Sequence, residues 1–276
     1  MNRLAVLGQP VAHSLSPRMH SAAFAALGID GDWSYEAIEL SPEGFADGVA
    51  ELRERGFKGA NVTIPHKHAA LEIADDASEA ARAIGAANTL TFDAAGIRAD
   101  NTDAPGLIAS LPASPAGRRA IVLGAGGAAR AAVWALLEAG AEVDVRNRTR
   151  DRADELVAAI GGRAVSAEGP IDLSGYEILV NTTSVGLAKP GANVRAPASD
   201  LKMLGIGADG LDEHTTLVDM VYAAETTELI AAGSRAGAAI VDGREILVRQ
   251  GALSFHIWTG LEPPLQTMRD AIESSR

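Results

Sequence analysis

The chain contains no cysteine among its 276 residues. That absence excludes disulfides, thiolate nucleophiles and zinc sites built on cysteine. No apolar run approaches the roughly 18 residues that a membrane-spanning helix needs. The N-terminal residues also lack the long apolar stretch and small-residue cleavage site of a signal peptide. We therefore expect a cytoplasmic protein that does not enter a membrane.

Positive charge is scarce as well. The sequence has 24 lysines and arginines against 36 aspartates and glutamates, a formal net charge of −12. An acidic chain without a basic stretch repels nucleic acid, so we expect no nucleic-acid partner. The simplest role of this charge is solubility. Since an acidic protein must build a local positive site to bind an anion, pairs of arginines become informative.

What the sequence does contain is an alternation of short apolar runs and helical patterns, which predicts α/β structure. The first region has expected strands at 4–7, 33–40, 59–64, 88–92 and 97–100, and helices at 17–27, 43–55, 67–73 and 77–84. A linker rich in proline and alanine, 111–117, precedes a second region with expected strands at 120–123, 142–145, 178–180, 217–220 and 239–241 and a helical tail from 244. Residues 187–214 fit no clear pattern, and we expect a short helix near 201–204 within them.

A glycine motif marks the start of the second region. The segment 124–129, GAGGAA, follows the apolar run 121–123 and opens a helical pattern, so it matches G-x-G-x-x-A in a strand–turn–helix context. Gly124 permits the tight turn, Gly126 lets the backbone approach a pyrophosphate, and Ala129 allows close packing of helix on strand. An ordinary glycine-rich turn is the alternative. The context favours a dinucleotide site.

The next strand bears on which dinucleotide binds. Enzymes that use NAD usually place an acid at the end of this strand to accept from the ribose, but Asp144 lies inside the strand, too early for that role. Arg148 and Arg152 are four residues apart, so they could converge on one phosphate if the local chain is helical. An arginine pair suits the 2′-phosphate of NADP. The alternative is two solvated surface arginines.

Three polar clusters could carry chemistry. In 61–67, NVTIPHK, a strand ends in polar residues, and strand ends are where α/β sheets bind ligands, so Asn61, Thr63 and Lys67 are candidates. His66 and His68 flank the lysine, but their spacing puts them on different helix faces, and we expect no metal site. Without more context, Lys67 could also be a surface lysine at the start of a helix.

The other two clusters have structural readings too. Asp103, in the run 101–103, could simply be the N-cap of the following helix. Ser16 with Pro17 would likewise make a good N-cap and first helical residue. Two hydroxyls at a helix start, Ser14 and Ser16, could also hold a carboxylate.

Taken together, these motifs resemble the shikimate dehydrogenase family, in order and over nearly the whole chain. They are HSLSP at 13–17, NVTIPHK at 61–67, GAANTL at 85–90, NTD at 101–103, GAGGAAR at 124–130, NRT at 147–149, NTTSVG at 181–186, DMVY at 219–222, LVRQGALSF at 247–255 and WTG at 258–260. The resemblance implies a two-domain α/β protein. An N-terminal α/β substrate domain, 1–103, would be completed by a returning tail, 238–276, and a Rossmann-type doubly wound NADP-binding domain would span 104–237.

The resemblance also implies an activity: reversible, NADPH-dependent reduction of 3-dehydroshikimate to shikimate, a step of chorismate and aromatic amino-acid biosynthesis. It implies that Lys67 and Asp103 are the catalytic pair. The implied substrate ligands are Ser14, Ser16, Asn61, Thr63, Asn88, Tyr222 and Gln250. The implied NADP contacts are Gly124, Ala125, Gly126, Gly127, Ala128, Asn147, Arg148, Thr149, Arg152, Met220 and Gly243.

The sequence departs from the family pattern at three places. Ala223 and Ala224 follow Tyr222 where Asn-Pro is usual, Ile246 stands where Met is frequent, and 187–214 is longer than usual. None touches the catalytic pair. The alternatives to the leading interpretation are a quinate/shikimate or aminoshikimate variant, a folate or tRNA-linked dehydrogenase of similar layout, and a catalytically silent NADP-binding module. The sequence does not decide between a homodimer and a monomer.

Overall fold

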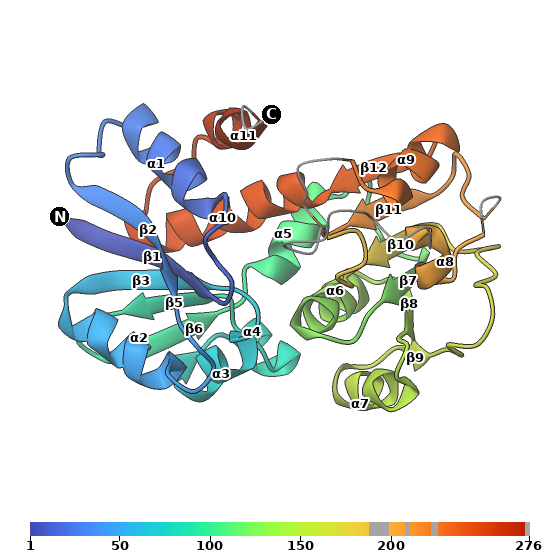
Figure 1. Cartoon of the computed structure of the whole chain (residues 1–276), viewed down its shortest axis with the longest axis horizontal. Coiled ribbons are helices and arrows are strands. Elements are labelled where there is room, and N and C mark those ends of the chain that lie inside the picture. Colours follow the sequence, from blue (N-terminus) through green and yellow to red (C-terminus); the bar gives the residue numbers. More distant parts are fainter. Residues whose placement is uncertain (188–198, 208–209, 222–225, 274–276) are drawn as a thin grey trace. The chain divides into compact units, whose positions relative to one another are not determined.

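The computed structural model of the chain describes residues 1–187, 199–207, 210–221 and 226–273. It divides into two compact units (Figure 1). The first unit combines Met1–Gly106 with Leu247–Arg276, and the second is Leu107–Ile246. The chain passes from one unit to the other within helix α5, Asp103–Ser110, and again within helix α10, Gly243–Thr259.

The first unit is built on a mixed six-stranded sheet of order β2-β1-β3-β5-β6-β4. Strand β1 pairs in parallel with β2 and β3, whereas β3 and β5, and β5 and β6, pair antiparallel. Its strands are β1 Asn2–Gly8, β2 Trp33–Glu39, β3 Phe57–Val62, β4 Asp76–Ala77, β5 Thr89–Phe92 and β6 Ile97–Asp100. Its other helices are α1 Ser16–Ala26, α2 Phe45–Glu54, α3 Lys67–Glu72, α4 Glu79–Ile84 and α11 Leu265–Glu273.

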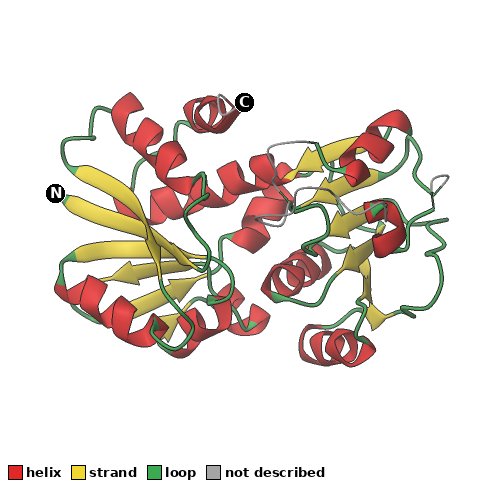
Figure 2. Cartoon of the chain, viewed as in Figure 1, coloured by secondary structure: helices red, strands yellow, loops and turns green. Residues whose placement is uncertain are grey.

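Helices cover both faces of this sheet, because its inner strand β1 is apolar on both sides. In β1, Leu4 and Val6 face a cluster formed with α1, α10 and α11, while Ala5 and Leu7 face a cluster formed with α2, α3 and α4. Alternate residues of a strand point to opposite faces. A continuous apolar run is therefore typical of a strand buried on both faces, and Figure 2 shows the resulting helix–sheet–helix layers.

The second unit has a fully parallel six-stranded sheet of order β12-β11-β10-β7-β8-β9. Read from the opposite edge, the sequence order of its strands is 3-2-1-4-5-6, which defines the doubly wound dinucleotide-binding fold. Its elements are β7 Arg119–Leu123, α6 Gly127–Glu138, β8 Glu142–Arg146, α7 Arg150–Ile160, β9 Arg163–Ala164, β10 Ile178–Asn181, α8 Asp200–Leu204, β11 Thr216–Asp219, α9 Glu228–Arg235 and β12 Ala239–Asp242. The predicted fold class is thereby confirmed.

Two apolar clusters sandwich this second sheet. Ala120 and Val122 of β7 pack with α6 and α7, whereas Ile121 and Leu123 pack with α8 and α9. Ile246, one of the departures from the family pattern, is 4% exposed and belongs to the first of these clusters. Its branched side chain therefore serves as core.

Some expectations need adjustment. The second sheet includes β12, which pairs with β11, so the returning tail of the first unit begins at Leu247 rather than at 238. The first crossing likewise falls after Gly106 rather than after 103, because α5 runs through that point. The expected helix near 201–204 is α8, and Ala223 and Ala224 lie outside the described residues. Helices α7 and α9 have no counterpart among the expected elements.

No helix in the described ranges is both long and apolar enough to cross a membrane. The same residues contain no group of three or more histidine, cysteine or acidic side chains arranged to bind a metal ion.

Candidate active site

Four polar segments of the first unit meet at one edge of its sheet. Strands β1 and β3 are parallel, so the loops that follow them leave from the same edge. Strand β5 is antiparallel to β3 and begins at this edge, and β6 ends there. Sheet topology alone therefore brings together four segments that are far apart in sequence. They carry Ser14 with Ser16, Thr63 with Lys67, Asn88, and Asp103.

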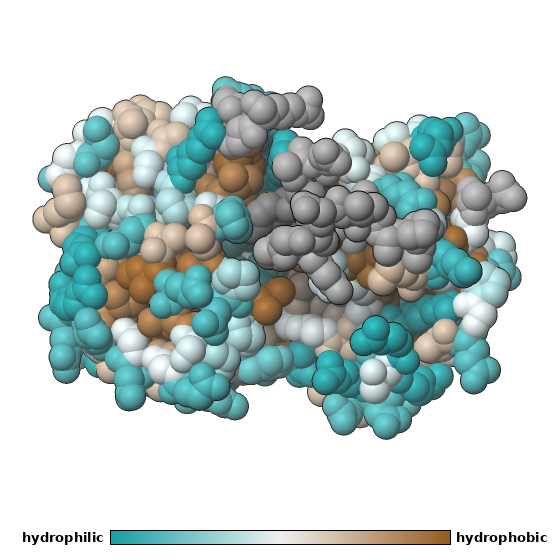
Figure 3. Space-filling view, in the orientation of Figure 1, coloured by the Kyte–Doolittle hydropathy of each residue, from teal (hydrophilic) through white to brown (hydrophobic). Residues whose placement is uncertain are grey.

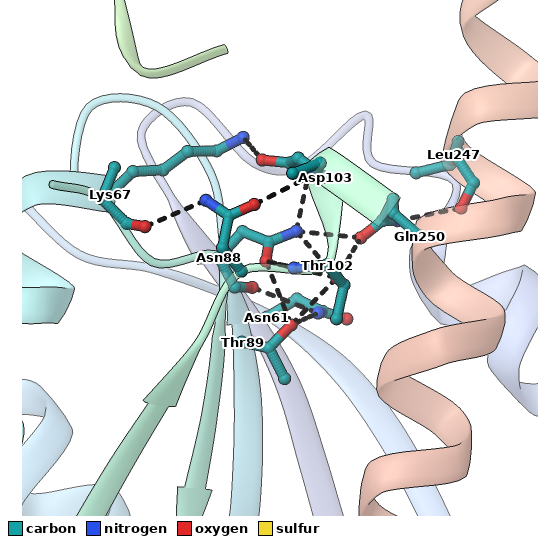
Figure 4. Close-up of polar contacts among 11 residues, drawn as sticks. Asn61, Lys67, Asn88, Thr89, Thr102, Asp103, Leu247 and Gln250 are labelled. Carbon is teal, nitrogen blue, oxygen red and sulfur yellow. Dashed lines mark hydrogen bonds and ion pairs between the residues drawn. The ribbon is translucent and has the colours of Figure 1, made fainter. Parts of the chain in front are cut away.

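Lys67 and Asp103 form an ion pair at this edge. The Lys67 Nζ atom donates to Asp103 Oδ2 at 2.6 Å, and the two side chains are 16% and 9% exposed. Lys67 is the first residue of α3, and its carbonyl accepts from Ala87 N at 2.8 Å, which fixes the backbone beneath the side chain. Figure 4 shows the lysine side chain extended toward the aspartate. The alternative of a solvated surface lysine is wrong.

Asn88 orients the aspartate. Its Nδ2 donates to Asp103 Oδ1 at 2.9 Å, while Asp103 Oδ2 accepts from the lysine. Both oxygens of the carboxylate are therefore held. Its Oδ1 in turn accepts from Thr102 N at 2.7 Å, which fixes the amide. The expected N-cap role of Asp103 is also wrong: Asn101 Oδ1 accepts from Ala104 N at 3.1 Å, and Asp103 is left for the lysine.

Helix α10 adds Gln250 to this network. Gln250 Oε1 accepts from Asn88 Nδ2 at 3.2 Å and from Thr102 Oγ1 at 3.5 Å, while its Nε2 donates to Leu247 O at 2.9 Å. Gln250 is 7% exposed and Thr102 is 3% exposed. Thr102 was not among the candidate residues. It stands directly before Asp103 in the NTD motif at 101–103, and that position was the available signal.

Asn61 connects Asn88 to the neighbouring strands. Its Oδ1 accepts from Tyr35 Oη at 2.7 Å, and its Nδ2 donates to Asn88 O at 3.2 Å and to Thr89 Oγ1 at 3.1 Å. Both amide hydrogens and the amide oxygen of Asn61 thus have partners inside the protein, and the residue is 6% exposed. Asn61 therefore supports the backbone of Asn88, and its expected contact with the substrate stays a prediction.

Three hydroxyl side chains at the same edge remain available. Ser16 is the first residue of α1 and Leu15 is the N-cap, so the expected capping by Ser16 is wrong. The Ser14 hydroxyl accepts from Ser16 N at 3.3 Å. Within the described part of the chain, no partner is found for the Ser16 or Thr63 hydroxyls. Gly8 lets the Thr63 methyl group pack against the β1 backbone, because a Cβ at Gly8 would overlap it.

The histidines near Lys67 are structural. His66 is 2% exposed, its Nε2 lies 2.8 Å from Leu40 O, and its ring stacks on Phe45 with centroids 4.5 Å apart. His68 is on the exposed side of α3, with Nδ1 2.7 Å from Gly85 O. Neither ring approaches the lysine–aspartate pair, so His66 is a poor rival to Lys67 as proton donor.

In the second unit, the glycine motif forms the turn that the sequence predicts. Gly124 has φ +116°, a conformation that favours glycine, and Gly126 is the N-cap of α6. A Cβ at Gly124 would overlap Thr182 Oγ1, whereas one at Gly126 would have nothing within 4 Å. Ala129 is fully buried. The turn therefore leaves open space beside free N–H groups at a helix start, which fits a pyrophosphate.

The next strand end carries the candidate 2′-phosphate ligands. The expected helical relation of Arg148 and Arg152 is not found, because α7 begins at Arg150 and Thr149 is its N-cap. Both arginines are nevertheless exposed, and neither has a hydrogen bond or ion pair among the described residues. Arg150, between them, is paired with Asp154 at 2.9 Å. Asn147 Nδ2 donates to Thr149 O at 2.8 Å and fixes the turn. The surface over α7, the helix that follows this turn, is hydrophilic (Figure 3).

The remaining candidates follow later strands of the same sheet. Met220 comes directly after β11, and Gly243 directly after β12, where a Cβ would come within 2.8 Å of Met220 O. These residues, the glycine turn and the 147–149 turn all lie at the carboxyl edge of the parallel sheet, on both sides of the point where strand order reverses between β7 and β10. Ligands of doubly wound folds bind there. Tyr222 lies outside the described residues.

Comparison with known proteins gives consistent matches along the chain. Family models match residues 6–90 (shikimate dehydrogenase substrate binding domain), 108–184 (shikimate / quinate 5-dehydrogenase) and 243–273 (shikimate 5′-dehydrogenase C-terminal domain). A shikimate dehydrogenase (NADP⁺) of Geobacter metallireducens is 41% identical over 96% of this chain and 94% of its own length.

Solved structures agree. A shikimate 5-dehydrogenase of Thermus thermophilus, in complex with NADP(H) and shikimate, matches with TM-score 0.86 and 40% identity over the whole of both chains. A 5-ketofructose reductase of a Gluconobacter strain matches with TM-score 0.86 and 31% identity, over 99% of this chain and 98% of its own.

Proposed function

The chain belongs to the shikimate dehydrogenase family, and we propose that it catalyses the reversible reduction of 3-dehydroshikimate to shikimate with NADPH. The observation that carries this proposal is the Lys67–Asp103 ion pair, held at 2.6 Å at the sheet edge of the first unit. A catalytically silent NADP-binding module would have no reason to keep a mostly buried charge pair beside free hydroxyls, because burying charge is unfavourable unless the pair is well satisfied.

The residues of the first unit have distinct roles in this proposal. When bound, NADPH supplies the hydride that reduces the ketone carbon. Lys67 Nζ faces the ketone oxygen, stabilises the negative charge that develops there and delivers a proton to it; in the oxidative direction neutral Lys67 accepts that proton. Asp103 holds the ammonium in place, and Asn88 holds Asp103.

We assign the substrate ligands as the resemblance to the family implies, and two of them have hydroxyls without a partner among the described residues. We assign the carboxylate to Ser14 and Ser16, at the start of α1, together with Tyr222. Thr63, Asn88 and Gln250 would bind ring hydroxyls, with Asn61 as support for Asn88. The free hydroxyls of Ser16 and Thr63 favour this assignment, since a ligand oxygen would supply the partners that they lack.

The second unit would hold the cofactor. The turn formed by Gly124, Ala125, Gly126, Gly127 and Ala128 fits the pyrophosphate, because the N–H groups that follow Gly124 have no partner among the described residues and the space beside Gly126 is open. Asn147, Arg148, Thr149 and Arg152 would bind the 2′-phosphate and adenosine side, and Met220 and Gly243 would lie near the nicotinamide. Unpaired arginines and the absence of an acid at the end of β8 support NADP rather than NAD.

One experiment tests the proposal. The purified chain is assayed by nicotinamide absorbance with shikimate and quinate, each with NADP and NAD, and in reverse with 3-dehydroshikimate and with 5-ketofructose, a polyhydroxy ketone without a carboxylate. We expect the highest kcat/KM for shikimate with NADP and little turnover of 5-ketofructose. Comparable efficiency with quinate would identify the quinate/shikimate variant. Turnover of none of these substrates would refute the proposal. A cytoplasmic location is a separate prediction.

A further inference from the structure

The second unit contains a buried carboxylate that the proposed mechanism does not use. Asp219 is the last residue of β11 and has no exposed surface. Within the described ranges no lysine or arginine forms an ion pair with it. Burial raises the pKa of Asp219 above its ordinary value, against hydrogen bonds that lower it. An uncompensated buried acid is unfavourable for stability, so its presence calls for a reason other than packing.

The carboxylate joins three segments of the chain. Its Oδ1 accepts from Asn181 Nδ2 at 2.9 Å and from Val221 N at 3.2 Å, and its Oδ2 accepts from Thr227 Oγ1 at 2.6 Å. Asn181 is the last residue of β10, Val221 belongs to the loop after β11, and Thr227 is the N-cap of α9, where its hydroxyl accepts from Ile230 N. One side chain thus fixes two neighbouring strand ends and a helix start.

Asn181 extends this control to the loop after β10. Its Oδ1 accepts from Thr183 N at 3.0 Å and from Thr183 Oγ1 at 2.8 Å, and that hydroxyl accepts from Val185 N at 3.1 Å. Thr182, between them, donates from its hydroxyl to Leu123 O at 2.7 Å. It also fills the space above Gly124, where a Cβ would overlap it. The loop held by Asn181 therefore forms one wall of the glycine turn.

We propose that Asp219 is a positioning residue for the cofactor: through Asn181, Val221 and Thr227 it holds residues 182–185, after β10, and Met220 with Val221, after β11, in the conformation that receives NADP. The proposal rests on the assignment of the cofactor to the carboxyl edge of this sheet. Asp219 acts before the cofactor arrives, because the hydrogen bonds form entirely within the protein. Pre-formed loops spare the ordering entropy that binding would otherwise require.

The test measures NADPH binding directly, by fluorescence titration without substrate. Asp219→Ala removes all three hydrogen bonds and should raise the Kd for NADPH at least about tenfold, the size expected for one or two lost buried hydrogen bonds. Asp219→Asn should stay within about threefold of wild type. Its amide oxygen can accept from Asn181 and Val221, and its Nδ2 can donate to Thr227 if that hydroxyl turns. Shikimate affinity should change less than NADPH affinity, since all of the assigned shikimate ligands except Tyr222 belong to the first unit.

A second pair of variants covers the case in which Asp219→Ala does not fold. Thr227→Val removes one donor to Asp219 and should weaken NADPH binding, whereas Thr227→Ser keeps the hydroxyl and should retain it. Asp144→Ala is the matched control, because Asp144 is another buried carboxylate of the same sheet. It should lower the melting temperature without changing the Kd for NADPH.

Two results would overturn the inference. One is an unchanged Kd in folded Asp219→Ala or Thr227→Val, which would reduce Asp219 to a structural residue. The other is an Asp219→Asn variant as weak as Asp219→Ala, which would assign the effect to charge instead of loop positioning. If wild type itself failed to bind NADPH, the proposed function would fall, and this outcome is distinct from both.

Discussion

The two sheet edges that carry the candidate sites differ in how their polar groups are satisfied. In the first unit, Lys67, Asp103, Asn88 and Gln250 bind one another through hydrogen bonds of 2.6–3.2 Å. In the second, the space beside Gly126 is open, and Arg148 and Arg152 have no partners among the described residues. The network around Lys67 is closed on itself, and we call this the closed site although hydroxyls beside it are free; the other site presents unused donors and is the open site.

This difference matches the task of each site. Groups that stabilise developing charge act best when they are oriented in advance, because reorientation during the reaction adds to the barrier. A lysine held by an aspartate, itself held by an asparagine, satisfies that condition. Groups that bind a permanently charged phosphate need only be within reach and free, since the ligand supplies the partners. The contrast predicts that variants at the two edges fail in different ways.

The largest effect is expected at the closed site. Lys67→Ala should lower kcat by about 10²–10⁴, the range typical of a positioned acid–base group, while the Kd for NADPH stays near wild type because the cofactor ligands belong to the second unit. Steady-state kinetics and fluorescence titration measure the two quantities. His66→Ala is the matched control: it removes the hydrogen bond to Leu40 and the stacking on Phe45, so it should lower stability and keep most of the activity. A folded Lys67→Ala enzyme with near wild-type turnover would refute the mechanism.

The open site should show a smaller and more selective effect. Arg148→Ala should lower kcat/KM for NADPH about 10–100-fold, because hydrogen bonds to charged groups contribute roughly 1.5–3 kcal/mol. The efficiency with NADH should not change, since NADH has no 2′-phosphate. Arg152→Ala should act in the same direction. Arg150→Ala provides the control, as its guanidinium is already paired with Asp154. Equal use of both cofactors by the wild type would contradict the assignment.

Much of the architecture could be predicted from the sequence, for a physical reason. Strands buried on both faces, such as 120–123, are continuous apolar runs, and sheet ligands gather where such strands end. The positions of Lys67, the glycine motif and Arg148 follow from that rule alone. The short helix α8 was expected near 201–204 because a long segment without structure is uncommon in a compact domain.

The rest depends on tertiary partners that a sequence does not reveal. Ser16 and Asp103 both have the residue type and position of N-caps. The N-cap of α1 is nevertheless Leu15, and the side chain that accepts from the start of α5 is that of Asn101. The sequence pattern predicts that Asn61 binds the substrate, but it does not show that the Asn61 amide is hydrogen-bonded to Tyr35 and Thr89. Capping preference is a local property, whereas the partner of a buried side chain is chosen by residues far along the chain, so local patterns could not decide these cases.

The substrate carboxylate offers a third test of the comparison, at the free hydroxyls of the closed site. Replacing both Ser14 and Ser16 with alanine should raise the KM for shikimate at least about tenfold, because each hydrogen bond to a charged group contributes roughly 1.5–3 kcal/mol, with a smaller change in kcat. Stability should change little, because Ser16 makes no capping bond and the double variant loses only the 3.3 Å hydrogen bond from Ser16 N to the Ser14 hydroxyl. Thermal unfolding and steady-state kinetics measure both quantities. A fall in melting temperature with an unchanged KM would assign the two serines a structural role only.

The smallest effect concerns a second ion pair, Arg163–Asp144, in which only the carboxylate is buried. Asp144 is 6% exposed and accepts from Arg163 Nη2 at 2.7 Å and from the Tyr176 hydroxyl, with Arg119 at 3.5 Å. Burial tends to raise the pKa of this carboxyl, but those hydrogen bonds and charges outweigh it and lower the pKa below its ordinary value. Burial, with Asp144 beside it, raises the pKa of Tyr176 to about 12.

Asp144→Asn should therefore lower stability by about 1–2 kcal/mol at neutral pH and leave kcat and both KM values unchanged; the value is modest because Arg163 is 68% exposed and solvent screens the pair. Since the pKa is lower in the folded state, the contribution of Asp144 is present above the unfolded value of about 3.9 and is lost as pH falls through the folded value. The difference in melting temperature between wild type and variant should be constant from about pH 7 to pH 5 and shrink below about pH 4, where wild-type Asp144 becomes neutral like asparagine. A difference that stays constant to low pH would mean that the carboxylate contributes through packing, and a loss of kcat would make this pair part of the active site.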